Sequence, residues 1–457
     1  MLKNLYAPRD MTEGAPWKSI VSFTIPMLIG NIAQQLYSTV DSIVVGKYIG
    51  DNALAAVGSA MPIINMLLVL FIGVSAGVNI MVAQYFGAKN REKLSWTIGN
   101  GLTVTAIVSV LLMIVATPVI RPVLHLLNTP ATILEGCHDY LFISLMGIAG
   151  MAFYNILSGI IRGMGDSFST LIYLLVATGI NIVLDIYFVA YVKMGIGGVA
   201  LATIIAQASS AILCMLKLSK MNGYFDFNPS FMKPEGAYVK TIVKLGIPSG
   251  LTQAIFSSAM IVVQSLTNCF GELFIAANVV IMRVDGFAMM PNFSFGMAMT
   301  TFAGQNVGAG LYDRVTKGAK QGTLIAVSCA TVITGIILLF GKGLMGIFTD
   351  TAELVDTSYY LMKILAAGYI AVAVTQSLSG VMRGAGDTLT PMWISLIATV
   401  VVRVPIAYGI SYLTRTAELP YGNSECIQIS LLLSWLIGAV VTVIFYKIGW
   451  WKSKSIH

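Results

Sequence analysis

Long apolar runs separated by short polar segments fill nearly all of this 457-residue chain. A helix needs about 20 mostly apolar residues to cross the hydrocarbon core of a bilayer. Twelve runs meet that requirement, at about 18–46, 53–84, 95–119, 133–160, 169–191, 196–219, 241–268, 274–305, 316–341, 356–381, 391–413 and 428–450. The pattern predicts an all-α membrane protein with twelve transmembrane helices and little room for a separate soluble domain.

The composition supports this class and excludes several others. Hydrophobic residues make up 57% of the chain and charged residues only 10%, whereas a soluble domain carries about 25% charged residues. Ordinary soluble enzymes and disordered chains are therefore excluded. The five cysteines are widely separated and the three histidines are too few for a multi-histidine metal centre. We expect no cofactor, no catalytic residues and no metal beyond a possible Na⁺.

Basic residues predict the orientation of the chain in the membrane. If both termini are cytoplasmic, nineteen Lys and Arg residues lie in inner segments, six lie in outer loops and two fall within spans. Basic residues accumulate on the cytoplasmic side of membrane proteins. We therefore expect a multi-pass protein of the cell membrane with both termini in the cytoplasm. The net charge of +7 reflects this topology, and we expect no nucleic-acid partner.

The second half of the chain repeats features of the first. The segment 158–166 (SGIIRGMGD) reappears at 379–387 (SGVMRGAGD), which is an offset of 221 in the numbering. The same offset pairs Gln84 with Gln305 and Gly50 with Gly271. Agreement at separate places indicates a duplication. The RGxGD pattern resembles a phosphate loop only loosely, and its recurrence favours a tight turn between helices over nucleotide binding.

The duplication predicts two pseudo-symmetric six-helix lobes around a central cleft. We assign residues 1–220 to the first lobe, 221–240 to a cytoplasmic linker and 241–457 to the second lobe. Six spans is an even number, so the lobes have the same orientation and are related by an axis along the membrane normal. Two such lobes can rock against each other, which is the geometry of alternating access.

Acidic residues inside the spans are the strongest functional signal. Three lie well within spans: Asp41, Asp185 and Asp285. Ionisable residues there cost several kcal/mol and mark functional sites by default. Side chains that share a helix face with Asp41 or Asp185, or lie in the next span, complete a candidate first-lobe cation site: Gln34, Tyr37, Asn181 and Thr203.

This group of oxygen atoms has three possible roles. Carboxylate, amide and hydroxyl oxygens are the ligands that hard cations prefer. Two neighbouring carboxylates can instead share a proton, and a purely structural polar network is a third possibility. In the second lobe the repeat replaces Asp41, Asp185 and Asn181 by apolar residues, so we expect the cation site only in the first.

Other residues are candidates for bending or for the substrate cavity. Pro26 lies inside the first span, where proline permits a kink, and the kink could couple ion binding to cavity shape or be passive. Arg403 and Asp285 are charged residues of the second lobe that could form a structural salt bridge or serve transport. The candidate cavity residues are Met61, Met151, Phe153, Tyr154, Asn155, Gln253, Gln264, Asp285 and Arg403.

These features together resemble the MATE (multidrug and toxic compound extrusion) family, in its DinF-like and MepA-like bacterial branch. The resemblance rests on the twelve spans in two halves, the RGxGD turns, the glutamine and glycine after the second span, and the acid-bearing helices. It implies export of organic, often cationic, compounds in exchange for Na⁺ or H⁺. The NorM-like branch has acids in the seventh and tenth spans, where this chain carries Gln253, Gln264 and Gln376.

We therefore expect a secondary active multidrug efflux transporter that works by alternating access. Its partners would be small organic cations or drugs and the lipid bilayer, and we expect a monomer. The main alternative is a flippase for lipid-linked precursors, which shares this architecture. A membrane-embedded enzyme is disfavoured because the three histidines lie in predicted outer loops or at residue 457, and no HExxH pattern is present. A channel lacks support from the duplicated lobes.

Overall fold

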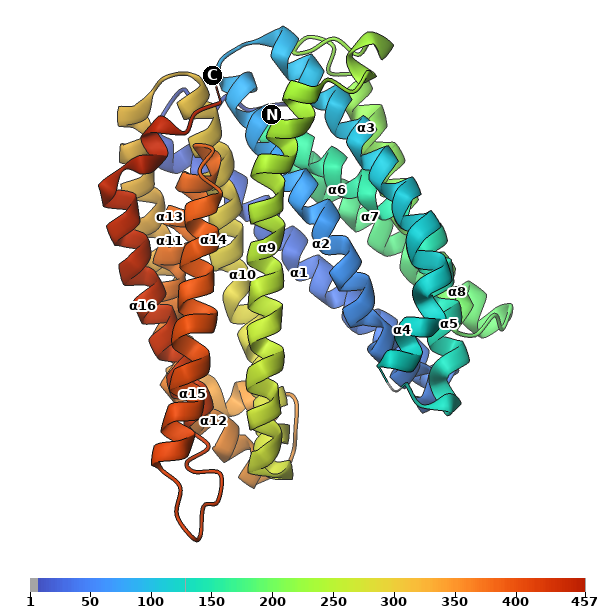
Figure 1. The fold of residues 1–457 in the computed structure, drawn as a ribbon, viewed down its shortest axis with the longest axis vertical. Helices are drawn as coiled ribbons and strands as arrows, with labels where there is room; N and C mark the ends of the chain where they lie inside the picture. The colour runs from blue at the N-terminus through green and yellow to red at the C-terminus, as the bar shows by residue number, and fades with distance from the viewer. Residues whose placement is uncertain (1–6, 128, 457) are drawn as a thin grey trace. The chain divides into compact units, whose positions relative to one another are not determined.

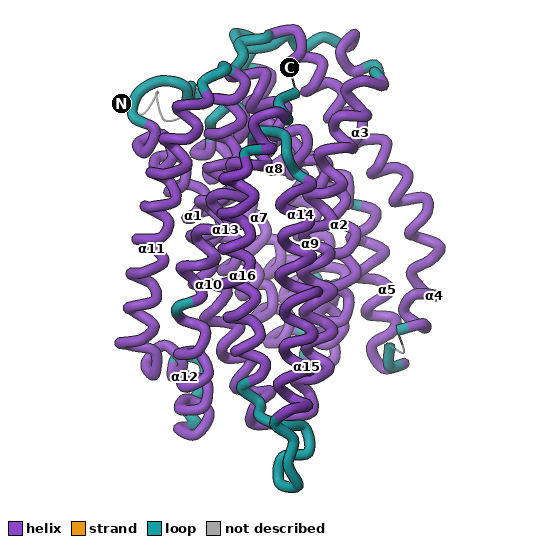
Figure 2. The backbone as a smooth tube through the Cα atoms, turned by 60° about the vertical axis from the view of Figure 1, so that its left-hand side comes forward, coloured by secondary structure: helices purple, strands orange, loops and turns teal. Residues whose placement is uncertain are grey.

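The computed structural model describes residues 7–127 and 129–456, and these are helical with no strand (Figure 2). The predicted cytoplasmic ends at residues 1–6 and 457 lie outside the described residues. The principal helices are α1 (Pro16–Tyr48), α2 (Asp51–Gly87), α3 (Arg91–Ala116), α4 (Ile120–Leu126), α5 (Ala131–Met146), α6 (Ile148–Gly163), α7 (Ser167–Asp185), α8 (Ile196–Ser219), α9 (Gly236–Thr267), α10 (Glu272–Gly308), α11 (Tyr312–Gly346), α12 (Ala352–Ala366), α13 (Gly368–Gly384), α14 (Leu389–Leu396), α15 (Arg403–Leu413) and α16 (Cys426–Ile448).

The described helices support the predicted spans. Nine are long and apolar enough to cross a membrane, and the number rises to 11 when the bent pairs α5–α6 and α12–α13 are each taken as one span. Helix α1 is not among these, but it is 33 residues long, so a count of twelve is consistent with the described helices. The pattern of apolar residues does not predict the bends, which measure 51° and 46°. Each lies at a glycine, Gly147 or Gly368, where a helix kinks readily.

Contacts divide the chain into two compact units. The first contains residues 1–10 and 25–250, and the second contains residues 11–24 and 251–457. The boundaries therefore fall within α1 and within α9, beside Pro26 and Pro248. The predicted division into lobes joined by a linker at 221–240 stays a prediction.

Corresponding pairs of helices pack closely in the two units. In the first unit α2 packs on α6, and in the second α10 packs on α13, with α16 alongside α13 (Figure 1). The close contact within each of these helix pairs is made by residues at equivalent positions of the repeat. A Cβ atom on Gly163 would lie 2.9 Å from the carbonyl oxygen of Asn79, and one on Gly384 would collide with that of Thr300. Both pairs keep the offset of the repeated segment, so the duplication extends to the packing of the backbone.

The repeated RGxGD segment forms the turn that the sequence predicts. Asp166 caps α7 by accepting hydrogen bonds from the backbone N–H of Ser169, at 2.9 Å, and from its hydroxyl, at 2.7 Å. Asp387 accepts the equivalent bonds from Thr390 at 3.1 and 2.7 Å. The preceding glycines have positive φ, 87° at Gly165 and 98° at Gly386, which side chains rarely adopt. The motif is a helix-connecting turn in both units.

Several hydrogen bonds attach the segment between α8 and α9 to α3, and one charged pair is among them. Arg91 donates hydrogen bonds to both carboxylate oxygens of Asp226, at 2.9 and 2.6 Å. These hydrogen bonds lower the pKa of the Asp226 carboxyl group below its usual value. The contribution of this charged pair to the attachment should therefore be complete above about pH 4, the ordinary value for aspartate, and be lost as the pH falls through the lowered pKa.

We expect the Asp226→Asn variant to loosen this segment at neutral pH and to remove the acid dependence of its protection. Amide hydrogen exchange of residues 222–228, followed between pH 3 and pH 7, measures both effects. The pair is exposed to solvent, so the global unfolding temperature should change little. Equal exchange in the variant and the wild type at neutral pH would contradict the attachment.

Candidate functional site

Asp41 and Asp185 are neighbours inside the first unit. Asp41 lies on α1, and Asp185 is the last residue of α7, immediately before the π-helix Ile186–Tyr191. Their carboxyl groups are close enough for an electrostatic interaction, and the residues are only 6% and 0% exposed. One carboxylate oxygen of Asp41 and both of Asp185 have no hydrogen-bond donor among the described residues. Buried carboxylates without donors are costly, so this pair calls for a cation or a proton.

The other predicted members of the site lie beside the two acids. The Tyr37 hydroxyl and the Thr203 hydroxyl are 3.2 Å apart. The side-chain nitrogen of Asn181 donates to the Thr203 hydroxyl at 3.5 Å, which leaves the Asn181 carbonyl oxygen buried and without a donor in the described part of the chain. The structure thus brings together Asp41, Asp185, Asn181, Tyr37 and Thr203 from α1, α7 and α8.

One further residue at the site has no signal in the sequence. Tyr140, on α5, is 3% exposed and is close enough to Asp41 and Asp185 for an electrostatic interaction through space. A tyrosine in an apolar helix resembles an ordinary packing residue, and only its place in the fold reveals it. With Tyr140 the site draws oxygen atoms from four helices.

A π-helix begins at the residue that follows Asp185. A π-turn adds one residue to a helical turn and occurs frequently at functional sites. The second unit has its own π-helix, Ile397–Val402, which ends immediately before Arg403. In each unit, therefore, a charged side chain borders a π-turn, although the charge is negative in one and positive in the other.

The first unit also contains a polar cavity of about 280 Å³. The predicted cavity residues Met151, Tyr154 and Asn155 line it, together with Pro26. Gln34, which the sequence predicts for the cation site, also lines this cavity. The predicted residues Met61 and Phe153 are absent from its lining. Met61 instead packs against the apolar core of the unit.

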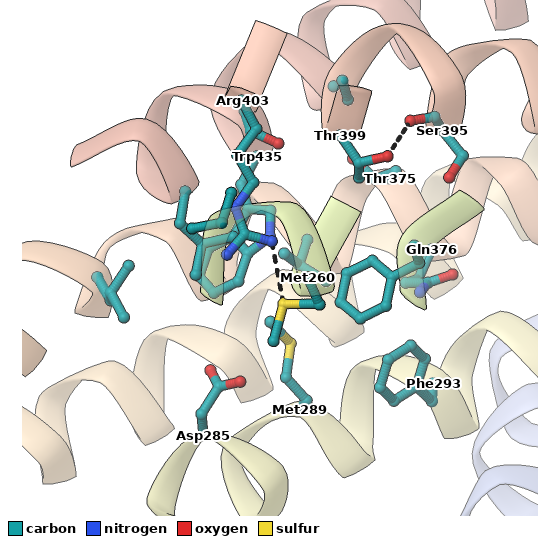
Figure 3. Close-up of a pocket in the computed structure, with 18 of the residues that line it drawn as sticks. Met260, Asp285, Met289, Phe293, Thr375, Gln376, Ser395, Thr399, Arg403 and Trp435 are labelled. Atoms are coloured by element: carbon teal, nitrogen blue, oxygen red, sulfur yellow. Dashed lines mark hydrogen bonds between the residues drawn. The ribbon is translucent and has the colours of Figure 1, made fainter. Parts of the chain in front are cut away.

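A larger cavity of about 400 Å³ lies within the second unit. Gln253, Gln264, Asp285 and Arg403 line it, together with Gln376. Figure 3 shows Asp285, Arg403 and Gln376 around this space. The Tyr369 hydroxyl donates to the Asp285 carboxylate at 2.9 Å. A cavity of this size can hold a drug-sized ligand.

The salt bridge that the sequence allows between Arg403 and Asp285 is not formed among the described residues. Nη1 of Arg403 contacts the Met260 sulfur at 3.1 Å, while Asp285 is bonded to Tyr369. The two charges interact through space without forming an ion pair in the described part of the chain. Figure 3 shows them extending toward the same space from different helices, with methionine sulfur between them.

A family model decides the identity of this architecture. The MatE model matches the chain twice, over residues 26–187 and 248–409. The second match begins and ends at the same distance along the chain from the first match. This distance differs by a single position from the distance between the two RGxGD segments. The chain belongs to the MatE family.

Relatives and solved structures agree with this assignment to MatE. A probable multidrug resistance protein of Bacillus subtilis, YoeA, is 29% identical over 426 residues, covering 91% of this chain and 92% of its own. A second from that organism, YpnP, is 27% identical over 447 residues, covering 98% of each chain. The crystal structure of a MATE protein in complex with MaL6 matches with a TM-score of 0.89 and 24% identity, covering 96% of this chain and 97% of that one.

Membership of MatE confirms the predicted class. The chain is a multi-pass membrane transporter and not an enzyme, and MatE transporters need no cofactor. The all-helical fold and the family resemblance are confirmed as well.

Proposed function

We propose that this MatE transporter exports small organic cations and drugs in antiport with Na⁺ or H⁺, and that Asp41 and Asp185 hold the coupling ion. The observation that carries the proposal is the group of buried oxygen atoms on these two acids and on Asn181 that have no donors among the described residues. Relatives named as multidrug resistance proteins support drugs as the transported compounds.

The oxygen atoms fit a small hard cation, and they equally fit a proton shared by the acids. Na⁺ would take the carboxylate oxygens together with the Asn181 carbonyl and the hydroxyls of Tyr37 and Thr203. A proton would instead convert one carboxylate into a donor for the other. Either ion neutralises negative charge at a buried position. We propose that the site holds the ion in one state of the transport cycle and releases it in another.

Ion binding can change the adjacent cavity through α1. Pro26 precedes Asp41 on the same helix by about four turns and lines the first-unit cavity with Gln34. When a cation draws Asp41 toward Asp185, the part of α1 that follows Pro26 moves with it, because proline leaves a carbonyl of the helix without its hydrogen bond. The shape of the cavity then depends on whether the ion is bound. The change of shape on ion binding displaces the drug to the outside.

The remaining parts of the proposal follow from the sequence. The positive-inside distribution supports a cytoplasmic location of both termini in the bacterial cell membrane. The lobes 1–220 and 241–457 would alternate between inward-facing and outward-facing states around the cleft. We propose that a monomer suffices, because the acids, Asn181 and the hydroxyls all come from one chain.

Vesicles that contain the purified protein test the coupling. A fluorescent organic cation is loaded, and a Na⁺ gradient and a pH gradient are imposed separately. We expect one of the two gradients to drive the cation out against its own gradient. Failure of both gradients, in vesicles that bind the dye normally, would contradict antiport.

The same vesicles also test the alternative function, a flippase for lipid-linked precursors. A flippase would move a labelled lipid-linked anion between leaflets and would not export the dye. Its loss from cells would impair envelope synthesis without changing their sensitivity to cationic dyes.

A further inference from the structure

Arg403 is a buried guanidinium with no anionic partner among the described residues. It is 2% exposed, and its Nε has no hydrogen-bond acceptor there. The acceptor that its Nη1 does have is the Met260 sulfur, at 3.1 Å, and a thioether is a weak acceptor. A buried charge normally has a partner of opposite charge, so Arg403 has unused capacity to bind an anion.

The cavity around Arg403 has a net positive charge. Its charged lining residues are Arg403, Arg383 and Asp285. Arg383 comes from the repeated RGxGD turn, as Arg162 does in the first-unit cavity. The single carboxylate, Asp285, is already bonded to Tyr369 and does not pair with Arg403. The polar part of the cavity is thus suited to an anion more than to a cation.

The rest of the lining suits an apolar or aromatic body. Phe256, Phe293 and Trp435 face the cavity together with Met260 and Met289, and Figure 3 shows Trp435 beside the Arg403 guanidinium. Methionine adapts to ligands of different shape. Three glutamine side chains, at 253, 264 and 376, add neutral donors and acceptors.

We infer that the second-unit cavity binds amphiphilic organic anions, in which a carboxylate or another oxyanion is attached to an aromatic or apolar body. The planar guanidinium of Arg403 binds the oxyanion through two parallel hydrogen bonds, and the aromatic residues hold the body. Asp285 lies across the same space, where it can accept an ammonium group of a zwitterion. The inference relies on the proposed export function only for the fate of the ligand, since binding itself can be measured without transport.

Three ligands of matched shape test the charge preference. The probes are 2-naphthoate, 2-naphthamide and 2-naphthylmethylammonium, which carry a negative, a neutral and a positive group on one ring system. Binding to the purified full-length protein is measured by calorimetry. A hydrogen-bonded charge pair predicts that naphthoate binds about 10-fold or more tightly than the amide. Equal binding of the two, or tighter binding of the ammonium, would overturn the inference.

Variants of Arg403 then assign the preference to one residue. Arg403→Met replaces the guanidinium by a shorter unbranched apolar side chain and removes an unpaired buried charge, so the protein should fold, and it should lose the roughly 10-fold preference for naphthoate. Arg403→Lys keeps the charge without the planar fork and should retain only part of the preference. Arg283, exposed on α10, provides the matched control Arg283→Met, which should bind like the wild type. If Arg403→Met keeps the preference, the assignment is wrong.

The natural anion could be a lipid phosphate or a soluble organic anion, and the composition of the surrounding membrane distinguishes the two. The measurement is repeated in nanodiscs of phosphatidylcholine alone and with phosphatidylglycerol. If lipid phosphate is the natural occupant, phosphatidylglycerol weakens naphthoate binding to the wild type and does not change it in Arg403→Met. If the occupant is a soluble anion, binding is the same in both membranes. Normal naphthoate binding without ion-driven export would leave this inference standing and reject the proposed coupling.

Discussion

The Asp185→Asn variant should fold normally and lose ion-coupled export, with the initial rate in vesicles falling about 100-fold. The amide keeps the size of the carboxylate but removes the charge that holds a cation or a proton. Hydrogen bonds to charged groups contribute about 1.5–3 kcal/mol, and two such contacts account for a loss of this size. Asp41→Asn should have the same effect, because both acids contribute to one site.

A thermal measurement separates this loss from misfolding. The oxygens of Asp185 have no donor among the described residues, so replacing this buried charge by a neutral amide should leave the unfolding temperature unchanged or higher. Asp139→Asn, at an exposed position of α5, is the matched control and should transport like the wild type. Efflux close to normal in both Asp185→Asn and Asp41→Asn would refute the ion site.

Adding one methyl group at Gly384 should destabilise the second unit. The new Cβ of Gly384→Ala would collide with the Thr300 carbonyl oxygen and lie 2.9 Å from the Cβ of Ala303. Backbone atoms cannot rotate away, so α13 and α10 must separate. Overpacking of this kind costs about 1–3 kcal/mol. We expect a lower unfolding temperature in detergent and a smaller folded fraction in size-exclusion chromatography.

The control for this variant is a glycine with open space around it. Gly335→Ala, on α11, meets nothing within 4 Å, and alanine is favoured over glycine in a helix by about 1 kcal/mol. Its unfolding temperature should equal or exceed that of the wild type. If Gly384→Ala is as stable as Gly335→Ala, the close contact between α10 and α13 is not important for stability.

Hydropathy predicts the helices well because the bilayer imposes their length. All twelve predicted runs coincide with helices or bent helix pairs. The bends at Gly147 and Gly368 and the two π-helices escape prediction, since they depend on packing that a hydropathy average does not contain. Asparagine and hydroxyl side chains near an intramembrane acid help to predict the members of a polar site. Asn181 lies on the same helix as Asp185, and its side chain contacts Thr203.

The cavities are less predictable than the acids. An apolar side chain has no feature in the sequence that separates packing from ligand contact, which explains why Met61 is predicted for a cavity that it does not line. The charge of a cavity also depends on residues from distant segments. The sequence motif places Arg383 only in a turn, whereas its side chain reaches the same cavity as Arg403.

The beginning of the chain completes the second unit, and this has a consequence for biogenesis. The Met11 N–H donates to the Gln305 side chain at 2.8 Å, across 294 residues, and Arg314 donates to the carbonyl oxygens of Met11, Glu13 and Gly14. During synthesis at about 5–20 residues per second, residues 11–24 wait about 15–60 s for these partners. Residues 11–24 therefore leave the ribosome well before their partners in the second unit, and until those partners are made they are available to chaperones and insertion factors.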